Sequence, residues 1–253
     1  KFRRACENAD RVIAVSDFTK KEIIQYYGID EKKIDVVYQG CDPVFAKEVS
    51  DEVKKDVSGR HNLPDRFLLY VGSIEERKNL LLAVKAVVML HEKGEDINIV
   101  VVGRSTPYLD EVVGYAEASG ISHLLHIRHG VNYDDLPVFY KLATAFVYPS
   151  RIEGFGIPML EAITSGLPAI GCTGSCLEEA GGPSSLYVNP DDVEGMADAI
   201  HSVYNDVTLR QNMIAQGKEY ARRFDIAKLT SDLYEVYKTV CGSHRGVGPN
   251  SLL

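Results

Sequence analysis

Residues 145–161 read AFVYPSRIEGFGIPMLE, and this stretch predicts a buried strand, a glycine-containing loop and the start of a helix. The run AFVY is short, apolar and uninterrupted, which is typical of a strand covered on both faces. Pro158 suits the first turn of a helix, because its missing N–H needs no partner there. Gly154 and Gly156 lack side chains, so a ligand can approach the backbone of this loop closely.

The same succession of apolar strand and amphipathic helix recurs along the chain from Phe67 onward. The predicted strands are residues 67–71, 97–102, 124–128, 145–148, 168–172 and 186–188. The predicted helices lie near residues 79–93, 107–119, 134–143, 158–165, 175–180, 192–205, 207–223 and 226–240. Uninterrupted apolar strands that are each followed by a helix indicate a parallel sheet with helices on both faces. The sequence therefore predicts an α/β fold, a doubly wound parallel sheet that forms a Rossmann-like domain.

The first 66 residues fit this pattern less well. Residues 11–16 (RVIAVS) and 34–38 (IDVVY) predict two further strands. Between them we expect a helix that Asp17 caps and Gly28 ends, and residues 46–62 predict a loop or short helix. We interpret the opening of the chain as the remnant of a preceding domain. The resulting division is residues 1–40 as remnant and linker, residues 41–240 as the ligand-binding sheet domain, and residues 241–253 as a tail.

Composition limits the class of protein. The apolar fraction of 45% and the charged fraction of 25% are those of an ordinary globular protein. The net charge of −8 argues against nucleic acid as a partner. No apolar run approaches the roughly 18 residues that span a bilayer. The five cysteines form no zinc pattern, so we expect reduced thiols, no bound metal and a cytoplasmic location, with a peripheral position at a membrane left open.

Two loops of the predicted sheet should face each other. In a doubly wound sheet the first strand lies beside the fourth, and ligands bind in the crevice between them. The loops that leave these strands are residues 72–79 (GSIEERKN) and 149–158 (PSRIEGFGIP). Arg77 and Lys78 in the first loop suit a diphosphate, since Arg offers a planar fork of donors and Lys a point charge. Taken alone, such a basic pair could equally be a solvated part of the surface. Its position opposite the second loop favours a role in ligand binding.

The second loop carries two glutamates. Glu161 is expected in the first helical turn, where the helix dipole favours a negative charge, so it also has a purely structural interpretation. Glu153, which precedes the two glycines, has fewer structural reasons to be acidic. A carboxylate such as Glu161 can accept both hydroxyls of a ribose. With the basic pair opposite, the two carboxylates point to a nucleotide sugar as the ligand.

The loops after the third and fifth strands could add contacts. Gly130 allows close backbone approach, so main-chain groups there could hold a base edge. His126 and His129 are interpreted as packed or solvated side chains rather than as ligands or catalysts. Gly174 and Ser175 could contact a sugar or phosphate, although Ser175 could equally cap the helix that follows.

Motifs of other enzyme classes are missing. The sequence has no GxxxxGK[ST] phosphate loop, no GxGxxG after the first sheet strand, no GxSxG nucleophile elbow and no HExxH metal helix. Dehydrogenase, kinase-type ATPase and hydrolase interpretations are therefore unsupported.

Several segments in this order resemble the donor half of the retaining, group 1 glycosyltransferases of GT-B fold and family 4 type. The matching segments are ADRVIAVSDFTKKEI, VVYQGCDP, YVGSIEERKNL, YPSRIEGFGIPMLEAITSGLPAIG and LYVNPDDVEGMADAI. Glu153 and Glu161 form the E-x7-E element of that family. The resemblance implies two Rossmann-like domains, with the nucleotide sugar held mainly by the carboxyl-terminal one.

The resemblance also implies roles for residues of this chain. Glu161 is expected to bind the ribose hydroxyls, Lys78 with Arg77 to neutralise the diphosphate and stabilise the leaving group, and Glu153 to lie near the donor sugar. The other expected donor contacts are Gly72, Ser73, Gly130, Gly154, Phe155, Gly156 and Ile157. Many members carry an arginine where this chain has Ser73, which leaves the pattern of phosphate contacts open. No cofactor or metal is expected besides the donor.

The donor and acceptor are only partly implied. The E-x-RKN form of the first loop is similar to that of many mannosyltransferases of polysaccharide biosynthesis, which favours a GDP-sugar over a UDP-sugar. The acceptor, a saccharide or a lipid-linked saccharide, is expected to bind the missing amino-terminal domain. Two alternatives stay open. They are a GT-B-fold sugar-nucleotide epimerase, which product analysis without an acceptor would identify, and a non-catalytic nucleotide-sugar-binding module or subunit that needs a partner chain.

Overall fold

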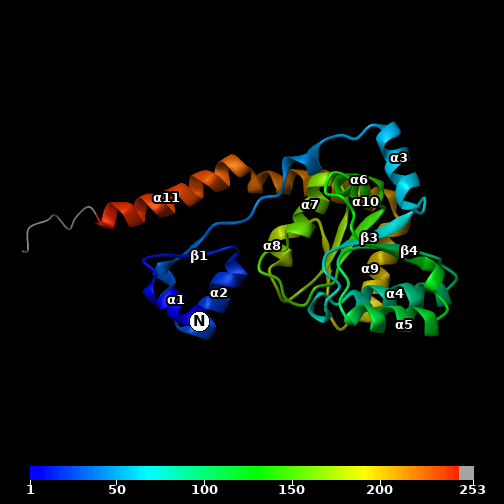
Figure 1. Cartoon of the computed structure of the whole chain (residues 1–253), viewed down its shortest axis with the longest axis horizontal. Helices are drawn as coiled ribbons and strands as arrows, with labels where there is room; N and C mark the ends of the chain where they lie inside the picture. The colour runs from blue at the N-terminus through cyan, green and yellow to red at the C-terminus, as the bar shows by residue number, and fades with distance from the viewer. Residues whose placement is uncertain (245–253) are drawn as a thin grey trace, which may run out of the picture. The chain divides into compact units, whose positions relative to one another are not determined.

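Six of the apolar runs form one parallel sheet in the computed structural model, which describes residues 1–244 (Figure 1). The strands are β3 (Phe67–Val71), β4 (Asn98–Val102), β5 (Leu125–Arg128), β6 (Ala145–Tyr148), β7 (Ala169–Cys172) and β8 (Leu186–Val188). Their order is β5-β4-β3-β6-β7-β8 and every pairing is parallel. This is the doubly wound order that the sequence predicts, so the predicted fold class is confirmed.

The change of direction in the strand order falls between β3 and β6. Leu68 pairs with Ala145 and Leu69 with Phe146, so the first and fourth strands of the sheet are neighbours in register. All four residues of β6 are buried. The carboxyl ends of β3 and β6 therefore open onto the same edge of the sheet, where ligands bind in this class of fold.

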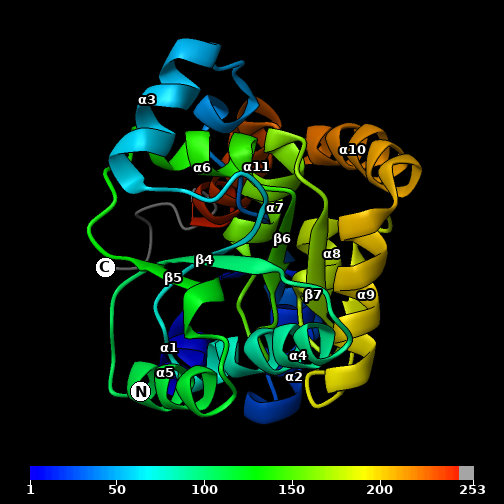
Figure 2. The same cartoon turned by 90° about the vertical axis from the view of Figure 1, so that its right-hand side faces the viewer.

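Helices cover both faces of the sheet. Their bounds are α3 (Asp51–His61), α4 (Leu80–Glu92), α5 (Tyr108–Ala118), α6 (Leu136–Leu142), α7 (Ile157–Ser165), α8 (Leu177–Gly181), α9 (Val193–Asn205) and α10 (Val207–Ala221). Helix α4 packs against α5 and α9, and α7 packs against α6, α8 and α10. Figures 1 and 2 show α4 and α5 on one side of the sheet and α6 and α7 on the other.

Contacts within the chain define two units, Cys41–Arg222 and a smaller one of Lys1–Gly40 with the residues from Arg223 onward. The smaller unit contains α1 (Phe2–Asn8), a parallel pair of strands β1 (Val12–Ala14) and β2 (Ile34–Val36), α2 (Asp17–Tyr27) and α11 (Ile226–His244). The sequence-based division instead places residues up to 240 with the sheet, and it stays a prediction. Of the predicted tail, residues 245–253 lie outside the described part.

Several local expectations need correction. Ser16, not Asp17, caps α2: its hydroxyl accepts a hydrogen bond from the backbone N–H of Thr19 at 3.0 Å. Gly28 ends this helix in the left-handed conformation, as predicted. Helix α8 starts at Leu177, so Ser175 lies outside it and does not cap it. Among the described residues, none of the helices combines the length and the apolar character needed to cross a membrane.

A cluster of charged side chains attaches α3 to the amino-terminal end of α6. The guanidinium of Arg60 donates to both oxygens of Asp135, at 2.7 and 2.8 Å, and Nε2 of His61 lies 2.9 Å from one of them. These hydrogen bonds and the charge of Arg60 hold the pKa of Asp135 at about 2. The contact matters for the site because α6 also carries Tyr140.

Candidate functional site

The loops that follow β3 and β6 contact each other directly. The first loop ends in a 3-10 turn, η3 (Glu76–Lys78), from which α4 continues. The backbone carbonyl of Arg77 accepts hydrogen bonds from the N–H of Arg151 at 2.9 Å and from the hydroxyl of Ser150 at 3.3 Å. The sequence-based expectation that these two loops face each other is therefore confirmed.

Glu153 lies at the centre of the contact between the loops. Its Oε1 accepts from the hydroxyls of Tyr148 at 2.9 Å and Ser150 at 3.0 Å. The same oxygen lies 3.2 Å from a guanidinium nitrogen of Arg77 and 3.8 Å from Nζ of Lys78. The side chains of Lys78 and Glu153 are 12% and 13% exposed, whereas that of Arg77 is half exposed. The site thus pairs a largely buried carboxylate with one largely buried and one accessible cation.

The groups of the site shift one another's pKa values. Burial lowers the pKa of the Lys78 ammonium; the charge of Glu153 opposes this effect and that of Arg77 adds to it. Burial and the charge of Glu153 raise the pKa of Tyr148 well above its ordinary value. Tyr148 therefore keeps its proton, and it can donate to the carboxylate while accepting from the lysine. A bound anion would be an additional partner for both cations.

Glu161 lies on α7, but not where the sequence places it. The helix begins at Ile157 and has no acidic residue in its first turn, so the expected dipole interaction does not explain this side chain. Its Oε2 accepts a hydrogen bond of 2.8 Å from the hydroxyl of Tyr140. Burial raises the pKa of Glu161, the hydrogen bond from Tyr140 opposes the rise, and the nearby Asp42 adds to it. Perturbed pKa values cluster at functional sites, which makes Glu161 a candidate functional residue.

Two tyrosines that hold the glutamates are missed by the sequence analysis. The rings of Tyr140 and Phe146 lie 5.4 Å apart and those of Phe146 and Tyr148 5.8 Å apart, so the three form one aromatic row. One end of the row donates to Glu161 and the other to Glu153. The period of two in the strand AFVY puts Phe146 and Tyr148 on one face. The run AFVY contains this signal, although its uninterrupted apolar character by itself predicts only a buried strand.

The glycines of the second loop have packing roles as well. Gly156 has φ of 99°, and a Cβ there would lie 2.7 Å from the side chain of Leu177 on α8. This position therefore needs glycine for the fold, independently of any ligand. Phe155 is buried, Gly154 lies in the loop before α7, and Ile157 is the first residue of that helix. Their predicted contacts to sugar or phosphate stay predictions.

The remaining predicted positions lie on neighbouring loops. At Gly72 a Cβ would come within 3.0 Å of Nζ of Lys78, so this glycine makes room for the ammonium. The carbonyl of Ser73 accepts from the hydroxyl of Tyr70 at 3.1 Å. Gly130 is left-handed, with φ of 64° and open space around it.

The side chains of His126 and His129 contact groups outside the Glu153 cluster, and the hydroxyl of Ser175 contacts none of the polar groups of that cluster. His126 lies 2.9 Å from the side-chain oxygen of Asn98, and His129 lies 2.7 Å from the carbonyl of Gly103, which agrees with packed or solvated roles. Ser175 is buried, and its hydroxyl has no hydrogen-bond partner among the described residues. A buried hydroxyl without a partner after β7 is a candidate ligand contact.

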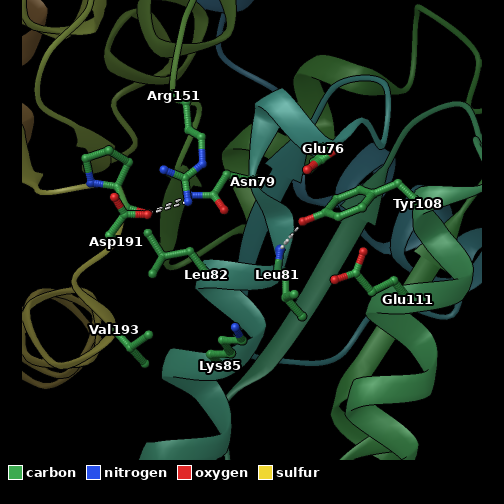
Figure 3. Close-up of a pocket in the computed structure, with 11 residues that line it drawn as sticks. Glu76, Asn79, Leu81, Leu82, Lys85, Tyr108, Glu111, Arg151, Asp191 and Val193 are labelled. Atoms are coloured by element: carbon green, nitrogen blue, oxygen red, sulfur yellow. Dashed lines mark hydrogen bonds and ion pairs between the residues drawn. The ribbon is translucent and has the colours of Figure 1, made fainter.

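A separate polar cavity of about 220 Å³ lies beside the start of α4 (Figure 3). An ion pair of 2.6 Å between Arg151 and Asp191 closes one side, and the hydroxyl of Tyr108 accepts from the N–H of Leu81 on the other. The side chain of Asn79 donates to the carbonyl of Pro190. None of the site residues predicted from the sequence lines this cavity. These two hydrogen bonds connect the start of α4 to Pro190 and Tyr108.

Comparison with known proteins finds two family matches. The model of "Glycosyl transferases group 1" matches residues 51–220, and that of "Glycosyltransferase Family 4" matches residues 1–45. Among curated relatives, O-antigen chain mannosyltransferase B of Escherichia coli is 26% identical over 242 residues, which cover 94% of this chain and 62% of the relative. Serotype-specific mannosyltransferase WbdA of Escherichia coli is 29% identical over 225 residues, which cover 87% of this chain and 28% of the relative.

Solved structures share the fold. A glycosyltransferase from Rickettsia africae superimposes with a TM-score of 0.85 at 19% identity, over 99% of this chain and 68% of that one. Anabaena HepE in complex with UDP and glucose gives a TM-score of 0.82 at 18% identity, over 92% of this chain and 64% of HepE. The chain thus spans less than two thirds of the length of the two curated relatives and of HepE.

Proposed function

This chain belongs to the group 1 glycosyltransferases, and from that premise we propose that it supplies the donor-binding half of a retaining glycosyltransferase. In this proposal a sugar is transferred from a nucleoside-diphosphate sugar to an acceptor. The observation that carries it is the contact between the loop with Arg77 and Lys78 and the loop with Glu153, at the point where β3 meets β6. Doubly wound sheets bind nucleotides at this point.

The two cations suit a diphosphate leaving group. When the bond between the sugar and the diphosphate breaks, negative charge grows on the phosphate oxygen. A half-exposed guanidinium and a fixed ammonium nearby stabilise that charge. We propose that Arg77 and Lys78 perform this task and that no metal ion held by the chain is needed. In residues 1–244, no group of three or more histidine, cysteine or acidic side chains is placed to hold one.

The two carboxylates suit the sugar parts of the donor. Glu161 faces Tyr140 with one oxygen, and we propose that its carboxylate accepts the ribose hydroxyls of the nucleotide. Glu153 lies next to the cations, so we propose that it contacts the donor sugar. The orphan hydroxyl of Ser175 supports a further contact from the loop after β7.

We further propose a mannosyl donor carried by GDP and a saccharide acceptor. The two curated relatives are named mannosyltransferases, one of them of the O-antigen chain. The RKN sequence of the first loop favours the same donor. The acceptor is proposed to bind an amino-terminal domain to which residues 1–40 belong, and the match of residues 1–45 to a family 4 model supports this.

Calorimetric titration of the chain with GDP, UDP, GDP-mannose and UDP-glucose tests the proposal. We expect saturable binding with a preference for the guanine nucleotides. Lys78→Ala and Glu161→Ala should each weaken binding at least tenfold, the scale of a lost hydrogen bond to a charged group. Lys85→Ala, which removes a lysine of α4 from the separate cavity, is the matched control. Absence of binding by the parent chain, or equal binding by all variants, would overturn the proposal.

A further inference from the structure

We propose that Tyr148 is a positioning residue of this site, whose hydroxyl keeps the Lys78 ammonium apart from the Glu153 carboxylate and so available to the diphosphate. The inference rests on the proposed function, because it assigns the ammonium to that ligand. It concerns a side chain that touches neither the diphosphate nor the sugar in the proposal. Its effect is exerted through the two charged residues that it contacts.

The hydrogen bonds of Tyr148 have only one possible direction. Nζ of Lys78 lies 2.9 Å from the phenolic oxygen, which lies 2.9 Å from Oε1 of Glu153. An ammonium can only donate and a carboxylate can only accept, so the phenol accepts from the lysine and donates its proton to the glutamate. The direct separation of Nζ and Oε1 is 3.8 Å, longer than a hydrogen bond. The hydroxyl therefore acts as a spacer between opposite charges.

The surroundings of Tyr148 make this spacer rigid. Its side chain is 1% exposed, and its ring packs between those of Phe146 at 5.8 Å and Tyr70 at 6.0 Å. At Gly72, a Cβ would lie 3.6 Å from the ring and 3.0 Å from the ammonium. The neighbouring rings therefore hold the phenol in place, and the missing side chain of Gly72 leaves space for the ammonium beside it. Tyr148, the last residue of β6, thus fixes the position of the Lys78 ammonium.

The donors around Glu153 all converge on one of its oxygens. The hydroxyls of Tyr148 and Ser150 and the guanidinium of Arg77 all approach Oε1. In the described part of the chain, none of these contacts reaches Oε2. The arrangement fixes the plane of the carboxylate and leaves its second oxygen to a ligand. Loss of the phenol would free the carboxylate to turn and close on Lys78.

Substitution Tyr148→Phe removes the spacer while keeping the ring. The ammonium and the carboxylate, now 3.8 Å apart, can then close to a direct hydrogen bond, with which a diphosphate must compete. We expect the affinity for a nucleoside diphosphate to fall about tenfold, the scale of one hydrogen bond to a charged group. The affinity for the corresponding monophosphate should change less than about twofold, since the proposed ribose contacts are untouched.

The matched control is Tyr70→Phe. Tyr70 is also buried, lies on the neighbouring strand, and donates to the backbone carbonyl of Ser73 instead of to a charged group. Both affinities should stay within about twofold of the parent in this variant. Equal losses of diphosphate and monophosphate affinity in Tyr148→Phe, or equal effects of the two variants, would contradict the inference.

A second measurement needs no nucleotide. Competitive acetylation of Lys78, followed by peptide mass spectrometry from pH 7 to 11, gives the titration midpoint of its amine. The charged groups that face this amine are Glu153, Arg77 and Glu75. Direct pairing with Glu153 in Tyr148→Phe should raise the midpoint, and Tyr70→Phe should leave it unchanged. An unchanged or lowered midpoint in Tyr148→Phe overturns the inference. A raised midpoint in a chain that binds no nucleotide would refute the proposed function alone.

Discussion

The contact between Arg60, His61 and Asp135 predicts a stability that depends on pH. The pKa of Asp135 is about 2 in the folded chain, against an ordinary value of 3.8. Because the folded value is the lower one, the contribution is fully present above pH 3.8 and disappears as the pH falls through 2. At about 1.4 kcal/mol for each pH unit, the difference corresponds to about 2.4 kcal/mol. Solvent around the half-exposed Arg60 reduces this to about 1.5–2 kcal/mol.

Urea unfolding of the parent chain and of Asp135→Asn, followed by circular dichroism, measures this contribution. At pH 7 the variant should unfold with a free energy about 1.5–2 kcal/mol smaller than that of the parent, and at pH 3 the difference should be about half as large. Asp134→Asn, which changes an exposed neighbour, is the control for the loss of one charge. A difference at pH 7 below about 0.5 kcal/mol, or one that is unchanged at pH 3, would refute the reasoning.

Two further substitutions test the residues around α7. Tyr140→Phe removes the hydrogen bond that lowers the pKa of Glu161, so more of this carboxylate should be protonated at pH 6. Calorimetry at pH 8 and pH 6 should therefore show a steeper fall of nucleotide affinity in the variant than in the parent. Parallel pH profiles would contradict this. Gly156→Ala places a Cβ at φ of 99° and 2.7 Å from Leu177, so thermal and urea unfolding should show a loss of about 2 kcal/mol. Gly114→Ala within α5, where nothing lies within 4 Å of a new Cβ, should cost nothing measurable.

The sheet could be predicted from the sequence because its signal is local. Most of the strands are uninterrupted apolar runs, each is followed by a helical pattern, and the doubly wound order then places the first strand beside the fourth. The two loops at the carboxyl ends of β3 and β6 followed from that order alone. This order predicts that Arg77 and Lys78 lie opposite Glu153, and the structure brings the three side chains together.

Other features could not be predicted because neighbouring residues offer nearly equal choices. Ser16 and Asp17 are both good helix caps, and only the folded backbone decides between them. A start of α7 at Ile157 instead of Pro158 moves Glu161 out of the first turn, so its expected dipole interaction is lost. Such one-residue shifts are within the usual uncertainty of helix ends.

Contacts between residues that are distant in the sequence could not be predicted either. Arg60 and Asp135 are 75 positions apart, and Tyr140 and Glu161 are 21 apart, so no local pattern connects either pair. Tyr148 is a different case, since it is the last residue of a strand that points into the predicted crevice. An aromatic hydroxyl at that position is a signal for a polar contact that the apolar interpretation of AFVY ignored.

The central claim is that the crevice between the loops after β3 and β6 binds a nucleoside diphosphate. The most direct measurement is a crystal structure of the chain grown with GDP or a GDP-sugar. We expect the terminal phosphate within hydrogen-bonding distance of Nζ of Lys78 and the ribose hydroxyls on the carboxylate of Glu161. A nucleotide bound in the separate cavity lined by Tyr108 and Arg151, with the crevice occupied by water, would contradict the account.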